Sequence, residues 1–141
     1  MTKKEITTIL ARATKEEVVK IAAPVREAYP VQIMKQPQKT LVMVKVRESI
    51  QRSLFYLGEV LACECMVMVN GVKGSSILAG DDFDKVLAAA VIDAALNGQV
   101  KESAGILTKL EGLRKAQEKS RAKQNARILK SKVNFQVMGE A

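Results

Sequence analysis

The chain has 141 residues, a length that supports one hydrophobic core and predicts a single domain over residues 1–141. Its hydrophobic fraction of 48% and charged fraction of 27% are typical of a globular domain, and no apolar run reaches the roughly 18 residues that a membrane span needs. It has no histidine, which removes the commonest general base and metal ligand. Glu5 and Arg12 interrupt any apolar signal segment at the start, so we expect a cytoplasmic protein.

The net charge of +8 is concentrated near the C-terminus. Residues 101–132 contain ten Lys or Arg against three Glu, a net charge of +7, whereas the remaining 109 residues carry +1. A basic stretch of this kind is found on solvated helix faces, at nucleic-acid contacts and opposite acidic protein surfaces. The sequence therefore predicts that any anionic partner binds this element.

Residues 1–30 read as a helical segment with two short helices, at 3–12 and 15–23. Each helix follows a threonine that is three residues before a glutamate, the capping-box pattern that satisfies the first backbone N–H groups. The two capping pairs are Thr2 with Glu5 and Thr14 with Glu17. Pro24 and Pro30 are expected to end helical structure, because proline lacks the N–H that a helix needs.

Residues 31–80 are rich in β-branched side chains and predict an antiparallel sheet of about four to five strands. The expected strands are 31–34, 40–48, 53–57, 59–69 and 72–79. Gly58 is expected to introduce a bulge or bend. Asn70-Gly71 is a strong signal for a two-residue type I′ hairpin turn.

The pair Cys63 and Cys65 raises the question of a reactive or metal-binding site. Counting back from the hairpin turn places Val69 opposite Val72, Cys65 opposite Ser76 and Cys63 opposite Leu78. Both cysteines then share an apolar face with Val67 and Val69, where a free thiol behaves as a small hydrophobe. The sequence supplies no further cysteine or histidine to complete a metal site, so we interpret the pair as part of the core.

Residues 81–98 form the most clearly patterned helix, which we call the core helix. Its apolar stripe follows the 3.6-residue period and contains Phe83, Val86, Leu87, Ala90, Val91 and Ala94. Asp81 and Asp82 suit its N-terminus and Asn97-Gly98 its end. Packing this stripe on one face of the sheet predicts a two-layer α+β fold.

Residues 101–138 are expected to form a basic helix followed by a terminal strand or arm at 132–138. The helix has two apolar stripes about half a turn apart, so a straight helix cannot bury both in one small core. The first stripe is Ile106, Leu110 and Leu113, and the second is Ala122, Ala126, Leu129 and Val133. Either the helix breaks near 117–121, or the second stripe, together with Phe135, meets another molecule. We favour the second interpretation.

Several segments, taken in order, resemble the PhnG family of the bacterial carbon–phosphorus lyase system. They include "ILARATKEEVVKIA", "VQIMKQPQKTLVMVKVRES", "FYLGEVLACECMVMVNGVKGSSILAGDD", "DKVLAAAVIDAAL" and "SKVNFQVM". The resemblance implies an accessory subunit that acts with H, I, J and L partners. In that system the G, H, I and L subunits join a phosphonate to C1 of the ribose of ATP and release adenine, with catalysis attributed to the I subunit.

The resemblance therefore implies no catalytic residue, no metal site and no cofactor bound by this chain alone, with ATP as a co-substrate of the complex. It singles out Arg47 and Glu59, within "VKVRE" and "LGE", as candidates near the substrate. An isolated chain could also form a homo-oligomer through its exposed stripe. The alternative is a small basic nucleic-acid-binding module using residues 101–132, although few aromatic residues are present to stack on bases.

Overall fold

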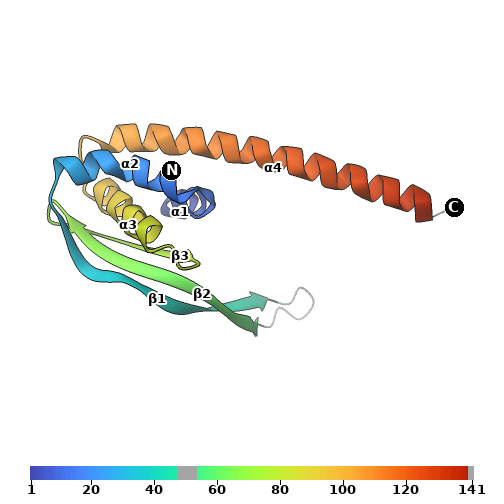
Figure 1. Ribbon diagram of the computed structural model, residues 1–141, viewed down its shortest axis with the longest axis horizontal. Coiled ribbons are helices and arrows are strands. Elements are labelled where there is room, and N and C mark those ends of the chain that lie inside the picture. Colours follow the sequence, from blue (N-terminus) through green and yellow to red (C-terminus); the bar gives the residue numbers. More distant parts are fainter. Residues whose placement is uncertain (48–53, 140–141) are drawn as a thin grey trace.

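The computed structural model describes the backbone of residues 1–47 and 54–139, and the side chains of residues 1–45 and 58–129. Within these ranges the fold is α+β, with four helices and a three-stranded antiparallel sheet in the order β1-β2-β3. Figure 1 shows α3 lying between the sheet and a second layer of helices, with both α4 and the far ends of β1 and β2 extending beyond this body.

The two N-terminal helices start where the sequence predicts. α1 (Lys3–Arg12) and α2 (Lys15–Ala28) both begin with complete capping boxes, in which each threonine hydroxyl accepts a hydrogen bond from the glutamate N–H at 3.2 Å. The expectation that Pro24 ends the second helix is wrong, since α2 continues to Ala28. Val25, directly after the proline, is fully buried, and this burial offsets the backbone bond that proline loses. Pro30 does follow the end of the helix.

The sheet has fewer and longer strands than the sequence predicts. β1 spans Val31–Arg47, β2 Leu54–Val69 and β3 Val72–Ala79, so the expected four to five strands are not confirmed. The expected break between the strands 31–34 and 40–48 is only a pair of register shifts within β1, and the bend near Gly58 is a register shift within β2. A bulge absorbs one extra residue without breaking the ladder, which is why the separate strands merge. Residues 48 and 53 of the predicted strands lie outside the described residues.

The hairpin between β2 and β3 has the predicted register. Asn70 and Gly71 have φ angles of 50° and 79°, as a type I′ turn requires. The strand partners are Val69 with Val72, Cys65 with Ser76 and Cys63 with Leu78. The predicted face is confirmed: Cys63, Cys65, Val67 and Val69 are all at most 2% exposed.

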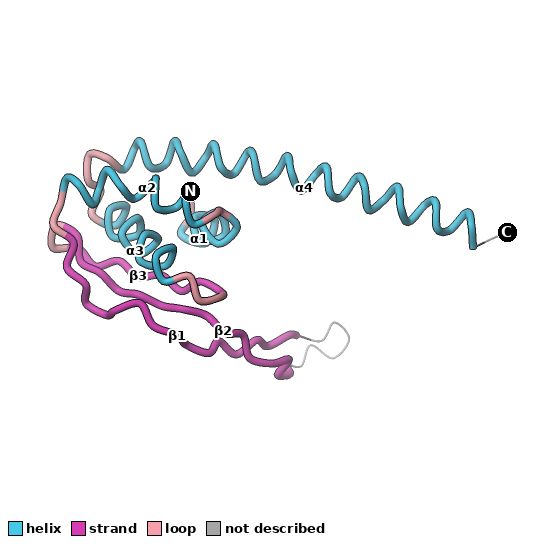
Figure 2. The backbone as a smooth tube through the Cα atoms, viewed as in Figure 1, coloured by secondary structure: helices cyan, strands magenta, loops and turns pink. Residues whose placement is uncertain are grey.

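α3 (Phe83–Asn97) is the centre of the fold and is buried on nearly all sides. It begins with Asp82, whose carboxylate accepts a hydrogen bond from the Lys85 N–H at 3.2 Å, and ends at Gly98. It packs on all three strands and, on its other side, on α2, so the predicted two-layer arrangement is wrong and the fold has three layers (Figure 2). The buried residues that surround its axis are Val86, Ala88, Ala89, Ala90, Val91, Ile92, Ala94 and Ala95. Phe83, expected in the stripe, is 38% exposed.

α4 (Ser103–Gly139) is one unbroken helix. Its first turns pack on α1, α2 and α3 through Ile106 and Leu110, which are 3% and 0% exposed. Gln117 continues this face, and its side-chain amide donates to the Ile9 carbonyl at 3.1 Å, where α1 ends. The expected terminal strand at 132–138 is wrong, because the backbone there remains helical to Gly139.

Candidate interaction surface on the strand arm and the terminal helix

The strands β1 and β2 extend well beyond β3, and this overhang forms an arm. β3 has 8 residues and pairs with Ala62–Val69, so among the described strands the segments 41–47 and 54–61 are each other's ladder partners. An isolated two-stranded ribbon has only marginal stability in water, since it buries little surface. The arm is therefore a structure that another surface would stabilise.

The arm exposes apolar side chains on both of its faces. Leu41, Met43 and Leu61 lie on the same face of the sheet as Cys63, the face that the helices cover nearer the body. Their exposed fractions are 60%, 57% and 46%. Val42 and Val60 are paired across the opposite face and are 39% and 41% exposed. Contiguous exposed apolar groups of this kind mark interaction sites more often than isolated ones do.

The second half of α4 also lies free of the body. Every described residue from Arg121 to Leu129 is exposed. Ile128 lies 18 residues after Leu110, about five turns, and so occupies the same face of the helix. Leu110 is 0% exposed against 54% for Ile128, so the face that packs on the body continues outward without a partner among the described residues.

A row of exposed cations runs along α4 into this free half. Four exposed cations follow one another at i, i+4 spacing: Lys115, Lys119, Lys123 and Arg127. Like charges at this spacing destabilise a helix by about 0.2–0.5 kcal/mol per pair. The arrangement is unfavourable for the chain alone and becomes favourable opposite an acidic surface.

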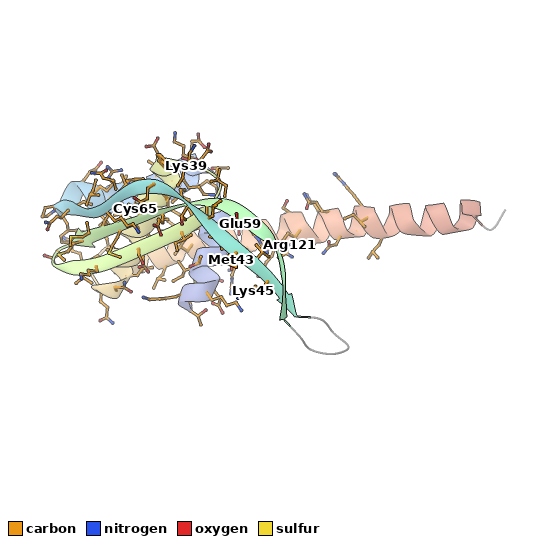
Figure 3. All side chains as sticks on the ribbon, turned by 90° about the horizontal axis from the view of Figure 1, so that it is seen from below. Lys39, Met43, Lys45, Glu59, Cys65 and Arg121 are labelled. Carbon is orange, nitrogen blue, oxygen red and sulfur yellow. The ribbon has the colours of Figure 1, made fainter. Side chains whose placement is uncertain are left out.

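The structure separates the two residues that the sequence placed near substrate. Glu59 lies on the arm opposite Met43, exposed, and among the described side chains none forms an ion pair with it (Figure 3). The backbone of Arg47 is at the end of β1, paired with Leu54, about 13 Å along the strand from Met43. The Arg47 side chain lies outside the described residues. The two residues are therefore not cross-strand partners.

The predicted interface residues lie on the outer part of α4. Ala122, Ala126 and Leu129 are exposed, and Leu129 is 62% exposed. Val133 and Phe135 belong to the same helix rather than to a strand, and their side chains lie outside the described residues. The role of this stripe as an interface therefore remains a prediction, and the helix that carries it is unbroken.

The two cysteines are almost completely buried. Cys63 and Cys65 are 1% and 2% exposed, and burial raises the pKa of both thiols; the nearby carboxylates of Asp82 and Asp81 raise the pKa of Cys63 further. A nucleophilic cysteine needs the opposite conditions, a lowered pKa and exposure. Among the side chains that the structure describes, no group of three potential metal ligands occurs.

Sequence reasoning missed the arm, which holds most of the exposed apolar side chains of the sheet. The residues of segments 41–47 and 58–61 read as ordinary strand residues, and their pattern carries no information on whether a third strand or a helix covers them. One signal was available: the two long β-rich stretches offer far more residues than the short return strand after Asn70-Gly71 can pair. The mismatch in length predicts an unpaired ribbon.

These features define a class of protein: a small α+β body whose interaction surfaces, an apolar arm and a basic helix, extend outside its core. No described helix is both long enough and apolar enough to cross a membrane. The family model of phosphonate metabolism protein PhnG matches residues 1–139, so the chain belongs to the PhnG family and has a role in phosphonate metabolism. A search of curated proteins found no match.

Proposed function

We propose that this chain is a non-catalytic accessory subunit of a cytoplasmic carbon–phosphorus lyase complex. In this proposal it supports formation of ribose 1-phosphonate 5-triphosphate from ATP and an alkylphosphonate, with release of adenine. The I subunit supplies the catalysis, and the H, J and L subunits are the further partners. Membership of the PhnG family supports this role.

The observation that carries the proposal is the exposure of apolar side chains on two projections of the same body. The arm exposes Leu41 and Met43, and the free half of α4 exposes Ile128 and Leu129. Both projections extend in the same direction from opposite sides of the body (Figure 1). A partner that contacts both projections would bury both apolar surfaces at once, and an acidic rim on that partner would neutralise the cations of α4.

In this proposal the positive charge of α4 promotes association with partners and provides a long-range electrostatic field. It takes no part in the chemical step. The basic helix raises the local concentration of anions, including triphosphate and phosphonate groups, and steers an acidic partner. Glu59 and Arg47 would lie at a wall shared with a partner, because the arm that carries them projects beyond the chain's own core.

The test is co-purification of the chain with a tagged I subunit. Ala126→Glu/Leu129→Glu should reduce the recovered complex by about tenfold or more, since it places two carboxylates in an apolar contact. Ala116→Glu/Thr108→Glu, which adds the same charge at exposed positions in the first half of α4, is the matched control and should leave recovery unchanged. If both variants recover the same amount of complex, the outer stripe of α4 does not form the interface.

The same sample tests the nucleic-acid alternative. A module that binds phosphates with the α4 cations would be retained on duplex DNA, and its affinity would fall steeply between 50 and 200 mM salt, by about 10³-fold for six contacts. Salt-dependent retention on DNA without recovery of the I subunit would favour that alternative.

A further inference from the structure

The outer edge of β3 is only half covered by the rest of the chain. β3 is the edge strand, and because Val69 and Val72 close the hairpin, residues 73, 75, 77 and 79 direct their N–H and C=O groups away from β2. Two of these groups are occupied. The Asn97 amide donates to the Lys73 carbonyl at 3.0 Å, and the Ser75 N–H donates to the Asp93 carboxylate at 2.9 Å.

The covering stops at Ser75. Among the described residues, no hydrogen bond satisfies the Ser75 carbonyl, the Ile77 N–H or the Ile77 carbonyl. Natural proteins usually cover, shorten or charge such an edge, because it can pair with any extended chain. Here α3 uses Asp93 and Asn97 to close the end near the hairpin and leaves the other end open.

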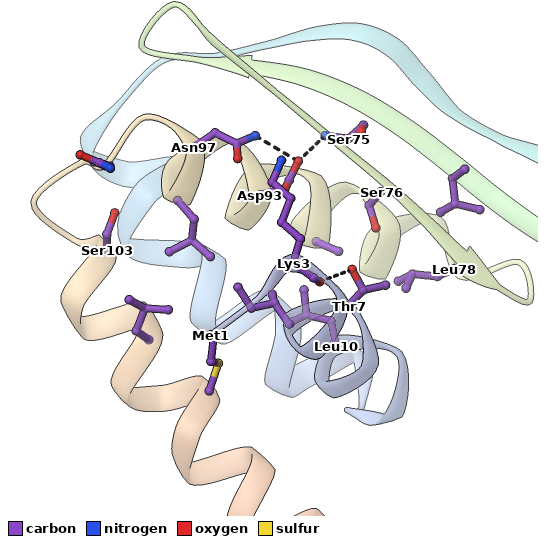
Figure 4. Close-up of a pocket in the computed structure, with 16 residues that line it drawn as sticks. Met1, Lys3, Thr7, Leu10, Ser75, Ser76, Leu78, Asp93, Asn97 and Ser103 are labelled. Atoms are coloured by element: carbon purple, nitrogen blue, oxygen red, sulfur yellow. Dashed lines mark hydrogen bonds between the residues drawn. The ribbon is translucent and has the colours of Figure 1, made fainter.

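A cavity of about 530 Å³ lies along this open edge (Figure 4). Four consecutive strand residues line it, Ser75–Leu78, and since alternate side chains point to opposite faces, only a cavity beside the backbone edge contacts all four. The opposite wall is one face of α1, formed by Lys3, Ile6, Thr7 and Leu10. The rest of the lining comes from α3, from the N-terminus and from the start of α4 with the turn before it: Ala89, Asp93, Leu96, Asn97, Met1, Gln99, Ser103 and Leu107.

The chemistry of the cavity fits an extended peptide. Its inner wall is apolar, with Leu10, Leu78 and Ala89, and its polar end has one carboxylate and one ammonium, with the Lys3 side chain directed toward Asp93 (Figure 4). The free backbone groups of Ser75 and Ile77 offer two acceptors and one donor, the pattern that strand addition uses. Because α1 forms a wall across from β3, the space admits a single extended segment rather than a second folded copy of the chain.

We propose that this groove binds an extended, uncharged segment of another subunit, which adds to the sheet as a fourth strand beside residues 75–79. Its backbone pairs with Ile77, and one apolar side chain enters the space between Leu10 and Leu78. Asp93 and Asn97 fix the register, because they already occupy the backbone groups on which the ladder would continue. This inference rests on the proposed function, since the segment comes from a partner subunit.

Amide hydrogen exchange resolved to single residues provides the test, on the chain alone and in the complex co-expressed with the I, H, J and L subunits. The Ile77 amide should exchange rapidly in the isolated chain and about tenfold or more slowly in the complex, because it gains a backbone partner. A complex that forms while the Ile77 amide stays unprotected overturns the groove and leaves the proposed function standing. If no complex forms, the proposed function fails, and the inference, which needs a partner subunit, fails with it.

Two variants of Ile77 distinguish the contribution of its backbone N–H from that of its side chain. Ile77→Pro removes the outward N–H at an edge position where proline does not break pairing with β2, and should weaken the complex about tenfold. Ile77→Thr keeps the N–H and shortens the exposed side chain, and should bind within about threefold of the parent. Equal affinity of the proline variant and the parent contradicts strand addition. If the proline variant does not fold, the exchange measurement still decides.

Discussion

Gly74 of β3 lies so close to Ala94 of α3 that a β-carbon on the glycine would be 2.2 Å from the Ala94 amide nitrogen. The same atom would be 2.5 Å from the Ala90 carbonyl oxygen. Both neighbours are backbone atoms of a buried helix, which cannot move aside as a flexible side chain would. The contact sets the distance between the central helix and the sheet.

We therefore expect Gly74→Ala to destabilise the protein by about 1–3 kcal/mol, because the helix and the strand must separate. Urea denaturation of the parent and the variant measures this change. Gly112→Ala is the matched control: nothing lies within 4 Å of its added carbon, and alanine in an exposed helix should stabilise by up to about 1 kcal/mol. Equal stability of the Gly74 variant and the parent would contradict the close contact.

The two halves of α4 should respond differently to the same substitution. Leu110 is fully buried, so Leu110→Ala should lower the free energy of unfolding of the isolated chain by about 2–5 kcal/mol. Leu129 is 62% exposed, so Leu129→Ala should change it by less than about 0.5 kcal/mol. Denaturation of both variants measures the difference, and a large loss for Leu129→Ala would show that the outer stripe already has a partner, such as a second copy.

Reversal of a charge within the row of α4 cations should strengthen the helix and weaken assembly. Lys119→Glu converts two like-charge pairs, with Lys115 and Lys123, into attractive ones, each favourable by about 0.2–0.5 kcal/mol. The helical circular dichroism should persist to higher temperature, while recovery with the I subunit falls. Lys20→Glu, an exposed charge reversal on α2, controls for net charge. Unchanged recovery of the Lys119 variant would indicate that the partner does not contact this row.

The thiols should react slowly in the native protein. Both are buried and have raised pKa values, so alkylation of Cys63 and Cys65 at pH 8 should be about 100-fold slower than in denaturant. Mass spectrometry over time, in buffer and in 6 M urea, measures both rates. Rapid labelling of either thiol in the native state would reopen the hypothesis of a catalytic cysteine.

The acid sensitivity of the sheet should depend on Glu64. Lys35 and Gln38 donate hydrogen bonds to its carboxylate and hold the pKa of Glu64 below its ordinary value. The hydrogen bond from Lys35 makes the larger contribution. Because the pKa of Glu64 is lower in the folded state, its ionised carboxylate stabilises the protein. This stabilisation is complete above the unfolded-state pKa of about 4.3 and is lost as pH falls through the folded-state pKa. The melting temperature of the parent should exceed that of Glu64→Gln at neutral pH, and the gap should close below about pH 4.

Glu27→Gln provides the background for this comparison. It makes the same change in charge at an exposed position on α2, where no ion pair occurs among the described residues. A gap for Glu64→Gln that stays constant from pH 7 to pH 3 would mean that the carboxylate contributes nothing through its charge.

Local sequence signals predicted the elements that depend on neighbouring residues. The capping boxes at Thr2 and Thr14, the turn at Asn70-Gly71 and the buried face of Cys63 and Cys65 all follow from spacing within a few residues. The same local rules failed where packing outweighed them. Pro24 remains inside α2 because its neighbours are buried, and the 132–138 alternation is helical.

The sequence by itself determined the helix starts, the hairpin register, the buried thiols and the half-turn offset between the two stripes of α4, because each depends on residues close together in the chain. Only the tertiary structure decided how far the sheet and α4 extend beyond the core, and that β3 keeps an open edge. These properties depend on which distant segments, β3, α1 and α3, cover a given residue. A pattern of side chains along one strand is the same whether or not another element packs against it.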